Sequence, residues 1–490
     1  MNEQHQPDEI INRREKTAEM KNNGILPYAE RFEVNASPGE AAGLEEGTTG
    51  VSTAGRVVAV RYFGKLAFGH IFDHTGKVQF ALQKNELGDS FGNFKRFVDV
   101  GDYIGITGDM FVTRTGETTV NVKEWTFLSK ALRPLPEKFH GLADREQILR
   151  KRYLDLITNP ESMHRFKTRT NVIKTIRNFL DGHDFIEIDT PVLTNKASGA
   201  LATPFVTHYD ALDMDVFLRI APETYLKRAV AGGLSRVYEF ARCFRNEGID
   251  PSHLPDFTML EYYAAYWNYR DNMDFTEKLV KHLLQEVNGS LTVTYRDQTI
   301  SFDGSWPRKT FRELILADSG IDINKHTDKP SLVREITAKG IDLERDIKDD
   351  SIGFGTLVDL LYKKVSRPKI INPVFLTSHP IDISPLARRN DENPDITDRF
   401  QLVAKGWEIV NAYSELIDPI DQRERFEKQM EARAAGDTEA MEIDEDFLLT
   451  MEHGMPPMSG WGMGIDRIVA LLTGVDNLRD VVLFPLLKPL

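Results

Sequence analysis

The chain has 490 residues, of which 41% are hydrophobic and 28% charged, and its formal net charge is −14. This composition is that of a soluble globular protein too long for one ordinary domain, and the acidic balance argues against indiscriminate nucleic-acid binding, which needs a basic surface. The only cysteine, Cys243, excludes an internal disulfide; with neither an apolar signal segment nor a run of about 20 apolar residues, we expect a cytoplasmic protein without membrane spans.

The first part of the chain predicts a helix followed by a small barrel. Residues 8–24 carry an amphipathic helical pattern that ends at Gly24. The basic residues expected on its polar side are Arg13, Arg14, Lys16 and Lys21. From Val51 to about Leu128 the pattern changes to short strands, with Gly76 and Gly116 where tight turns are expected. Short strands crowded into one segment favour an oligonucleotide-binding barrel.

A proline-containing segment, KALRPLPEKFHG from Lys130, predicts a linker to the rest of the chain. Beyond it, helical and strand patterns alternate to the C-terminus. Residues 165–182 predict an amphipathic helix that leads into FIEIDTPVL, a strand stopped by Pro191. The expected domains are 1–50, an N-terminal helix and loop; 51–130, the barrel; 131–150, the linker; and 151–490, a larger domain with a helical insertion at about 307–370.

The most informative segment runs from Val237 to Tyr263 and reads VYEFARCFRNEGIDPSHLPDFTMLEYY, which predicts two strands around a charged loop. The loop and its edges carry Arg245, Glu247 and His253. Under the two-residue period of a strand, one face presents Phe257, Met259, Glu261 and Tyr263. A stacking ring and a carboxylate beside an arginine suit a nucleotide and an amine bound side by side. The alternative is a surface ion-pair loop above a core phenylalanine, although a buried carboxylate would need a partner.

Residues 460–472, GWGMGIDRIVALL, predict a strand with alternating glycines followed by a helix. Alternating glycines let a flat ligand lie close to the backbone, and Arg467 near the helix start could meet a phosphate. The segment lacks the lysine of a P-loop and does not open a dinucleotide-binding unit, so a purely structural junction is the alternative.

Two further segments carry polar side chains. If KGWEIVNAYSELID is a strand, one face presents Trp407, Ile409, Asn411, Tyr413 and Glu415, which suits a polar cationic ligand. Glu408 would then face the other way unless the strand is bulged or ends there, and an exposed edge strand is the alternative. In IAPETYLKRAVAGG, Glu223 follows a proline at a helix start, where an acid is also favoured by the helix dipole. No Ser/His/Asp, CxxC or HExxH pattern is present, so the chemistry must come from positioning and charge.

Together these segments resemble the class II aminoacyl-tRNA synthetases. FIEIDTPVL is similar to their first motif, FRNEGI with DFTMLEYY to their second, and GMGIDRIVALL to their third. The barrel indicates the subgroup for lysine, aspartate and asparagine, and APETYLKR, FRNEGI and NAYSEL are similar to the lysyl-tRNA synthetases. The resemblance implies an α+β fold, an N-terminal OB-fold β-barrel followed by a catalytic domain built on an antiparallel sheet flanked by helices.

The resemblance also implies an activity, lysine–tRNA ligation, in which L-lysine and ATP give lysyl-adenylate and pyrophosphate before lysine passes to the 3′ end of tRNA(Lys). It implies Mg²⁺ and a homodimer. Catalysis would depend on Arg245 and Arg467. The ATP-binding residues would be Arg245, Glu247, His253, Phe257 and Arg467. The lysine-binding residues would be Gly199, Glu223, Glu261, Tyr263, Asn411, Tyr413 and Glu415. Glu408 would hold the metal, and the anticodon would be read by Phe68, Gln79 and Glu117.

Several positions depart from the family pattern. Gln401 stands where a second metal-binding glutamate is usual, which puts the magnesium arrangement in doubt. The other departures are Thr203, Trp407, Trp461 and, in the barrel, Val60. Two other functions remain open: a ligase that lysylates a protein, against which the barrel speaks, and a non-catalytic RNA-binding protein, against which the nearly complete set of site residues speaks.

Overall fold

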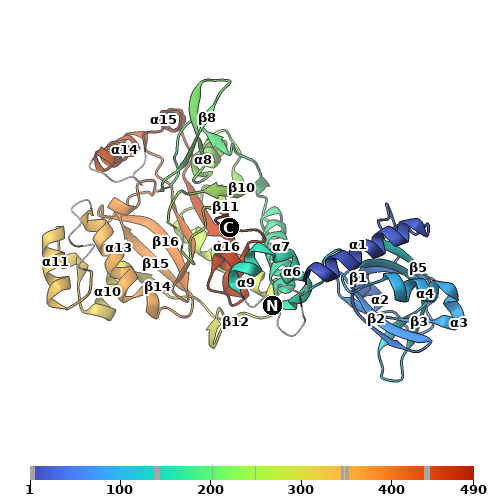
Figure 1. The fold of residues 1–490 in the computed structure, drawn as a ribbon. Helices are drawn as coiled ribbons and strands as arrows, with labels where there is room; N and C mark the ends of the chain where they lie inside the picture. Colours follow the sequence, from blue (N-terminus) through green and yellow to red (C-terminus); the bar gives the residue numbers. More distant parts are fainter. Residues whose placement is uncertain are drawn as a thin grey trace. The chain divides into compact units, whose positions relative to one another are not determined.

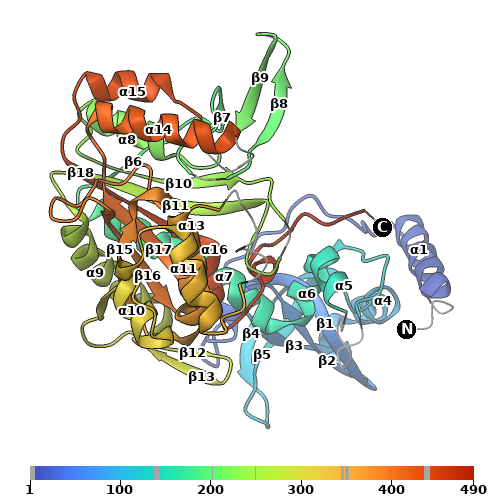
Figure 2. The same cartoon turned by 90° about the vertical axis from the view of Figure 1, so that its left-hand side faces the viewer.

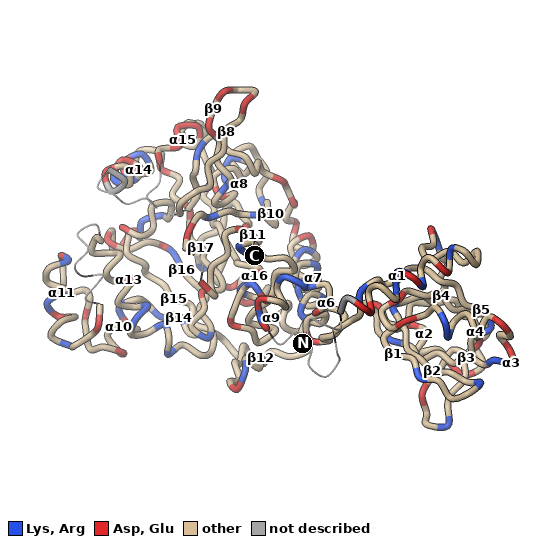
Figure 3. Tube along the Cα trace, viewed as in Figure 1, with Lys and Arg blue, Asp and Glu red and all other residues tan. Residues whose placement is uncertain are grey.

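The computed structural model describes residues 6–136, 144–200, 202–248, 250–343, 347, 352–434 and 442–489, and part of the predicted linker lies outside them. The chain divides into two compact units, residues 1–163 and 164–490 (Figure 1). Figure 3 shows basic and acidic positions interspersed along both units, so the excess of acids is not gathered in one segment. No helix in the described part of the chain is long and apolar enough to cross a membrane.

The first unit contains a closed five-stranded barrel, as the strand pattern predicts. Its strands, in the order β1-β2-β3-β5-β4 around the barrel, are β1 Val51–Phe63, β2 Leu66–Phe72, β3 Lys77–Gln83, β4 Tyr103–Val112 and β5 Thr118–Ser129. Buried and partly exposed residues alternate along β1 and β2, so one face of each strand fills the interior. Two helices missing from the sequence prediction, α3 Lys84–Leu87 and α4 Asp89–Phe97, follow β3, and α4 buries Phe91, Phe94 and Phe97 in the core.

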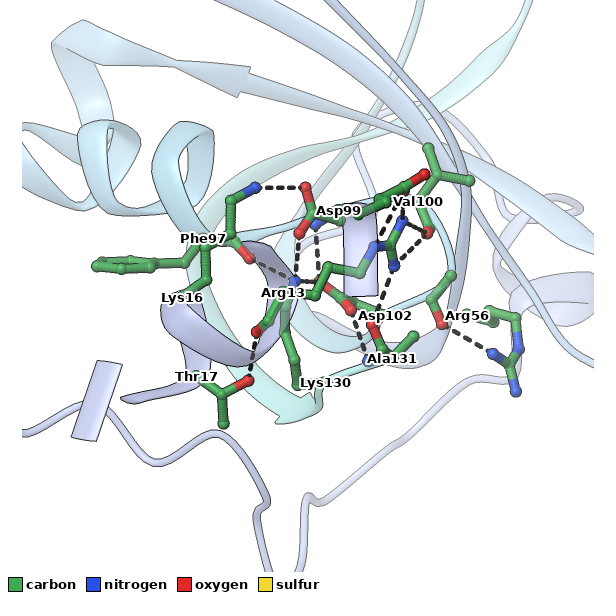
Figure 4. A network of polar contacts seen from close by, with 12 residues as sticks. Arg13, Lys16, Thr17, Arg56, Phe97, Asp99, Val100, Asp102, Lys130 and Ala131 are labelled. Carbon is green, nitrogen blue, oxygen red and sulfur yellow. Dashed lines mark hydrogen bonds and ion pairs between the residues drawn. The ribbon is translucent and has the colours of Figure 1, made fainter. Parts of the chain in front are cut away.

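Helix α1, Gln6–Asn22, is tied to the barrel by a polar network (Figure 4). Arg13 is only 5% exposed and donates hydrogen bonds to the backbone oxygens of Val100 and Ala131. Lys16 pairs with Asp99. Arg13 and Lys16, two of the basic residues predicted on the polar side of the helix, therefore dock it against the barrel. A short helix, α2 Pro38–Ala41, also interrupts the segment predicted as a loop. The unit ends with α5 Arg145–Arg150, α6 Arg152–Thr158 and the start of α7 Pro160–Asp181.

The second unit is built on an eight-stranded sheet in the order β14-β15-β16-β17-β18-β11-β10-β6. Its pairs are antiparallel except the outermost two, β14–β15 and β6–β10. The strands are β6 Ile186–Glu187, β10 Arg236–Phe244, β11 Asp256–Ala265, β14 Arg308–Thr310, β15 Val374–Pro380, β16 Ile396–Ala404, β17 Trp407–Ser414 and β18 Met458–Gly464. The predicted antiparallel sheet flanked by helices is therefore present.

Helices cover the sheet in separate groups. The main core packs α7, α9 Tyr269–Asn288 and α16 Ile465–Leu472 against the central strands. A smaller core gathers α8 Glu223–Ala231, α14 Pro419–Ala434 and α15 Glu445–Glu452, which Figure 2 shows together at one end of the sheet. A further core contains α10 Phe311–Ser319, α11 Lys329–Ala338 and α13 Phe354–Val365.

Smaller elements complete the second unit. The predicted strand FIEIDTPVL is reduced to β6 and to β7 Leu193–Thr194, which joins β8 Phe205–Tyr209 and β9 Met214–Leu218 in a separate sheet. A two-stranded hairpin is formed by β12 Thr292–Tyr295 and β13 Gln298–Ser301. The 3₁₀ turns are Ile323–Lys325, Arg367–Lys369, Ile381–Ile383 and Leu478–Val481.

Candidate active site

A row of glycines on β18 forms the floor of a pocket between two polar strands. Gly460 pairs with Tyr263 on β11 and Tyr413 on β17, and Gly462 pairs with Glu261 and Asn411 in the same way. The glycines leave room that the neighbouring side chains use, since a Cβ on Gly460 would lie 2.3 Å from the ring of Tyr263. The opposite face of β18 buries Trp461, which stacks on Tyr262 of the core. The ring of Trp461 thus packs in the core, although the residue borders the pocket between the two glycines.

The pocket encloses about 310 Å³ and is lined by strands, helices and loops of the second unit. The predicted residues that line it are Gly199, Glu223, Arg245, Glu247, His253, Phe257, Glu261, Tyr263, Glu408, Asn411, Tyr413 and Arg467. Glu415 lies directly beneath, with Oε1 2.1 Å from where a Cβ of Gly460 would be. Gln401 is outside the lining and 9% exposed. All predicted residues for ATP and lysine therefore meet at one site.

Two arginines with unmet charge lie at one end of the pocket. The guanidinium of Arg245 lies 5.1 Å from the centre of the Phe257 ring, and its Nε is buried without a hydrogen-bond acceptor among the described residues. Arg467, in the first turn of α16, donates to the backbone oxygen of Glu408 at 3.1 Å. Burial lowers the pKa of Arg467, and the nearby charges of Arg367 and Arg245 act in the same direction. Buried cations that repel one another favour a polyanion between them.

The loop between β10 and β11 is held in place by backbone and side-chain contacts. Nδ1 of His253 lies 2.6 Å from Oδ2 of Asp250. Burial alone would raise the pKa of Asp250, but its bonds with Ser252 and His253 bring it down to about 2. The backbone N–H of Asn246 donates to the backbone oxygen of Thr203 at 2.8 Å. Since Thr203 makes this contact through its backbone, the contact does not depend on which side chain stands there.

Asp466 joins two of the site-bearing elements and was missed in the sequence. Its Oδ2 accepts from the backbone N–H of Thr258 at 2.9 Å, and its Oδ1 accepts from Arg169 at 2.6 Å. Thr258 follows Phe257, and Asp466 precedes Arg467. The bond therefore fixes the aromatic ring and the second arginine relative to each other.

The opposite end of the pocket is acidic and buried. Glu223 is the first residue of α8, yet its side chain makes no capping bond; it accepts from Tyr413 Oη at 2.7 Å and from Lys227 at 2.5 Å. The helix-cap interpretation of this residue is therefore wrong. Glu261 accepts from Tyr263 Oη at 3.0 Å. Glu415 forms an ion pair with Lys227, while no side-chain donor among the described residues reaches its Oε1.

Burial changes the ionisation of this acidic end. It raises the pKa of Glu415 to about 8, although the Lys227 ammonium opposes the shift. It also raises the pKa of Glu261 well above its ordinary value, with the charge of Glu223 acting in the same direction. For Lys227, burial lowers the pKa, but the two glutamates more than offset it and the pKa is raised. An acidic, desolvated pocket of this kind is suited to organic ammonium groups.

A bulge in β17 decides which way Glu408 points. Leu402 pairs with Val410 and Val403 with Glu408, so Ile409 is an extra residue on its strand. Glu408 consequently faces the pocket with Asn411, while Trp407 packs against the main core. The strict alternation predicted for this strand is therefore wrong at Trp407.

Arg399 is a second residue missed in the sequence. It lines the pocket from β16 and donates from Nε to Oδ1 of Asn411 at 2.8 Å, which orients the amide. Gln401 pairs with Asn411 across the strands but stays out of the cavity. Within the described ranges no group of three or more His, Cys, Asp or Glu side chains could hold a metal ion. A cation at this site would need ligands from a bound substrate beside Glu408.

The barrel gathers its predicted residues on its outer face. Phe68 alternates with buried neighbours on β2, and Gln79 of β3 pairs with His70 of β2. Glu117 accepts from Gln79 at 2.6 Å, and its other oxygen lies 2.7 Å from Nε2 of His70. The structure thus adds His70 to the predicted set. Val60 packs against the barrel core.

Comparison with known proteins agrees with both units. Residues 144–488 match the family described as tRNA synthetases class II (D, K and N), and residues 51–128 match the OB-fold nucleic acid binding domain. The chain is 47% identical over 480 residues to the lysine–tRNA ligase of Pelotomaculum thermopropionicum, covering 97% of this chain and 94% of that protein. It is 46% identical to the lysine–tRNA ligase of Carboxydothermus hydrogenoformans over 97% of both chains, and 43% identical to that of Staphylococcus haemolyticus over 98% of both.

Proposed function

From the premise that the chain belongs to the class II tRNA synthetases (D, K and N) and acts as a lysine–tRNA ligase, we propose a role for each part of its pocket. The arginine end binds ATP. Arg245 meets the α-phosphate, Arg467 with Glu247 and His253 holds the remaining phosphates, and Phe257 stacks on adenine. Support comes from the buried Nε of Arg245, which has no acceptor among the described residues, and from the positive charges of Arg245 and Arg367 near Arg467.

The acidic end binds lysine. Glu223 and Glu261, with the backbone at Gly199, hold the α-ammonium, and Asn411 with Arg245 meets the carboxylate. Tyr263, Tyr413 and Glu415 surround the ε-ammonium. The observation that carries this assignment is the buried Oε1 of Glu415, which takes up the room left by Gly460 and has no side-chain donor among the described residues. A site built around that oxygen rejects a neutral side chain, because the buried carboxylate would lose its partner.

Activation needs no protein base. A carboxylate oxygen of lysine attacks the α-phosphorus of ATP, and pyrophosphate leaves. Arg245 and Arg467 hold positive charge where negative charge develops. The ribose hydroxyl at the 3′ end of tRNA(Lys) then attacks the adenylate carbonyl, and AMP leaves. The chain therefore works by positioning and charge.

Magnesium fits the phosphate end together with ATP. Mg²⁺ is usually bound through one or two carboxylates plus phosphate oxygens and water, and Glu408 is a carboxylate that lines this end beside Glu247. The ion would supply positive charge to the phosphate oxygens. Gln401 is neutral and does not line the pocket, so we assign Glu408 as the protein ligand of the ion.

The barrel reads the anticodon through Phe68, Gln79 and Glu117, by stacking and base-edge hydrogen bonds.

We infer that the protein forms a homodimer and is located in the cytoplasm. Apolar side chains are left exposed on and beside β6, β7 and β8; they are Ile186, Val192, Leu193, Val206 and Leu212. Such a surface supports contact with a second copy, which light scattering after gel filtration would measure as twice the chain mass.

The test of the function is ATP–pyrophosphate exchange with each standard amino acid in turn, followed by charging of total tRNA. Lysine alone should support rapid exchange, and tRNA(Lys) should become lysylated. Exchange that does not depend on lysine would overturn the proposal. Exchange with lysine but no charging of tRNA would instead indicate another acceptor.

A further inference from the structure

Lys227 is a buried ammonium inside the proposed lysine pocket that no substrate role accounts for. It lies one turn after Glu223 on α8, and its side chain is 1% exposed. Its Nζ is 2.5 Å from Oε1 of Glu223 and in ion-pair contact with Oε2 of Glu415. The rings of Tyr413 and Phe447 lie 5.6 Å from the same nitrogen. The chain thus places its own cation between two acids that are assigned to the substrate.

The number of buried carboxylates at this end of the pocket suggests why the Lys227 ammonium is there. Three carboxylates, those of Glu223, Glu261 and Glu415, are 6%, 5% and 2% exposed. Buried carboxylates need charged or hydrogen-bonding partners. Lysine brings two ammonium groups, one fewer than the carboxylates. With Lys227 included, three carboxylates meet three ammonium groups.

We propose that Lys227 is a specificity-determining residue, the chain's own third ammonium, which pairs with Glu223 and Glu415 and holds them in place for the two ammonium groups of lysine. This rests on the proposed function. It has a consequence for the empty pocket, in which three carboxylates face one internal ammonium. The excess negative charge is relieved by protons on the carboxylates, and bound lysine displaces these protons into the buffer.

Titratable and charged groups from every neighbouring element face the three carboxylates. Helix α8 contributes Glu223 and Lys227, β11 contributes Glu261 and Tyr263, and β17 with the residue after it contributes Tyr413 and Glu415. Two arginines are also near: Arg245 follows β10, and Arg399 of β16 donates a hydrogen bond to Asn411. Burial raises the pKa of Glu415 to about 8 and that of Glu261 well above its ordinary value. At neutral pH the empty pocket therefore retains protons, and their release makes lysine bind more tightly as the pH rises.

Replacing Lys227 by methionine keeps an unbranched side chain, one atom shorter, and removes its charge. Because the ammonium lowers the pKa of Glu415, which is about 8 in its presence, the variant moves that pKa further upward, and lysine must displace the proton at a greater cost than in wild type. A protonated Glu415 no longer attracts the ε-ammonium. The loss should therefore be largest at low pH and smaller at high pH, which a purely structural role would not produce.

The first measurement is ATP–pyrophosphate exchange by Lys227→Met between pH 6.5 and 9. We expect the KM for lysine to rise about a hundredfold at pH 7 and to recover at least partly by pH 9, while the KM for ATP stays close to wild type. The matched control is Lys130→Met in the barrel, because Lys130 is also fully buried and pairs with two acids, Asp99 and Asp102. The control should leave the KM for lysine unchanged. Equal rises for lysine and ATP, or a lysine effect independent of pH, would overturn the proposal.

The second measurement needs no variant and therefore does not depend on Lys227→Met folding. Lysine is titrated into the wild-type chain at pH 7 in two buffers of different ionisation enthalpy, and the difference between the observed binding enthalpies gives the protons released. We expect about one proton per lysine bound. Binding without proton release would overturn the charge count. Wild-type exchange with lysine separates the two proposals: its absence defeats the proposed function, whereas its presence without proton release defeats this inference alone.

Discussion

Gly460 faces the carboxylate of Glu415 across the floor of the pocket, and a Cβ on the glycine would lie 2.1 Å from Oε1 of the acid. The missing side chain leaves room for the carboxylate that is proposed to bind the ε-ammonium of lysine. Gly460→Ala should therefore raise the KM for lysine about tenfold to a hundredfold while the KM for ATP changes little, because the added methyl group displaces Glu415 or the substrate. Steady-state exchange with each substrate varied separately measures both constants.

The same strand supplies the control for that substitution. A Cβ on Gly462 would have its nearest neighbour, Cγ of Glu261, at 3.6 Å, which is an ordinary contact. Gly462→Ala should thus change the KM for lysine much less than Gly460→Ala. Equal effects of the two alanines would mean that backbone conformation, and not the space in front of Glu415, limits binding.

At the other end of the pocket, Arg245→Lys keeps the charge but loses the planar fork and its stacking over Phe257. We expect the KM for ATP to rise at least about tenfold and the maximal exchange rate to fall, since the arginine is assigned to the phosphate that reacts. Exchange at saturating lysine with ATP varied checks this. An unchanged rate at saturating ATP would limit Arg245 to substrate binding.

Much of this site follows from the sequence, because side-chain direction in a regular strand has a simple period. The face carrying Phe257, Glu261 and Tyr263 is one example, and the glycines of β18 are another. Glu408 was ambiguous, because the bulge at Ile409 depends on pairing with a partner strand and leaves no local mark.

Lys227 and Arg399 were missed for a different reason. Lys227 stands four residues after Glu223, which in sequence is an ordinary helical ion pair. Its buried ion pair also needs Glu415, which is far away in the sequence and contacts the same ammonium in the fold. Arg399 likewise acquires its role only through Asn411 on the next strand. In the first unit, Arg13 of α1 is of a residue type that is usually exposed, yet it is buried by contacts with Val100 and Ala131.

The raised pKa of Glu415 gives a stability prediction for the empty protein. Its folded-state value, about 8, lies above the ordinary 4.5, so the protonated form favours folding and this contribution is lost as the pH rises through about 8. Between pH 6 and 9 the Tm of the wild-type catalytic unit should fall more steeply than that of Glu415→Gln, which cannot ionise. Calorimetric melting curves of both proteins without ligand measure the two slopes. Parallel slopes would contradict a titrating Glu415.

The barrel should act on tRNA and not on activation. Glu117→Ala removes the acceptor that holds Gln79 and contacts His70. We expect a higher KM for tRNA(Lys) in aminoacylation, by roughly tenfold for a lost base contact, with pyrophosphate exchange unchanged. Glu124→Ala, at an exposed acid on β5, the strand that follows Glu117, is the control and should leave both reactions unchanged. A fall in exchange with Glu117→Ala would show that the barrel substitution disturbs the catalytic unit.

The recognition of lysine by Glu415 is tested most directly by Glu415→Gln, with the KM for lysine and the KM for ATP measured in the same exchange assay. The amide keeps the shape of the side chain and removes the charge that the ε-ammonium needs. The KM for lysine should rise by about a hundredfold or more while the KM for ATP stays within about twofold of wild type. Equal changes in both constants, or no change in the KM for lysine, would contradict the assignment of Glu415 to the substrate ammonium.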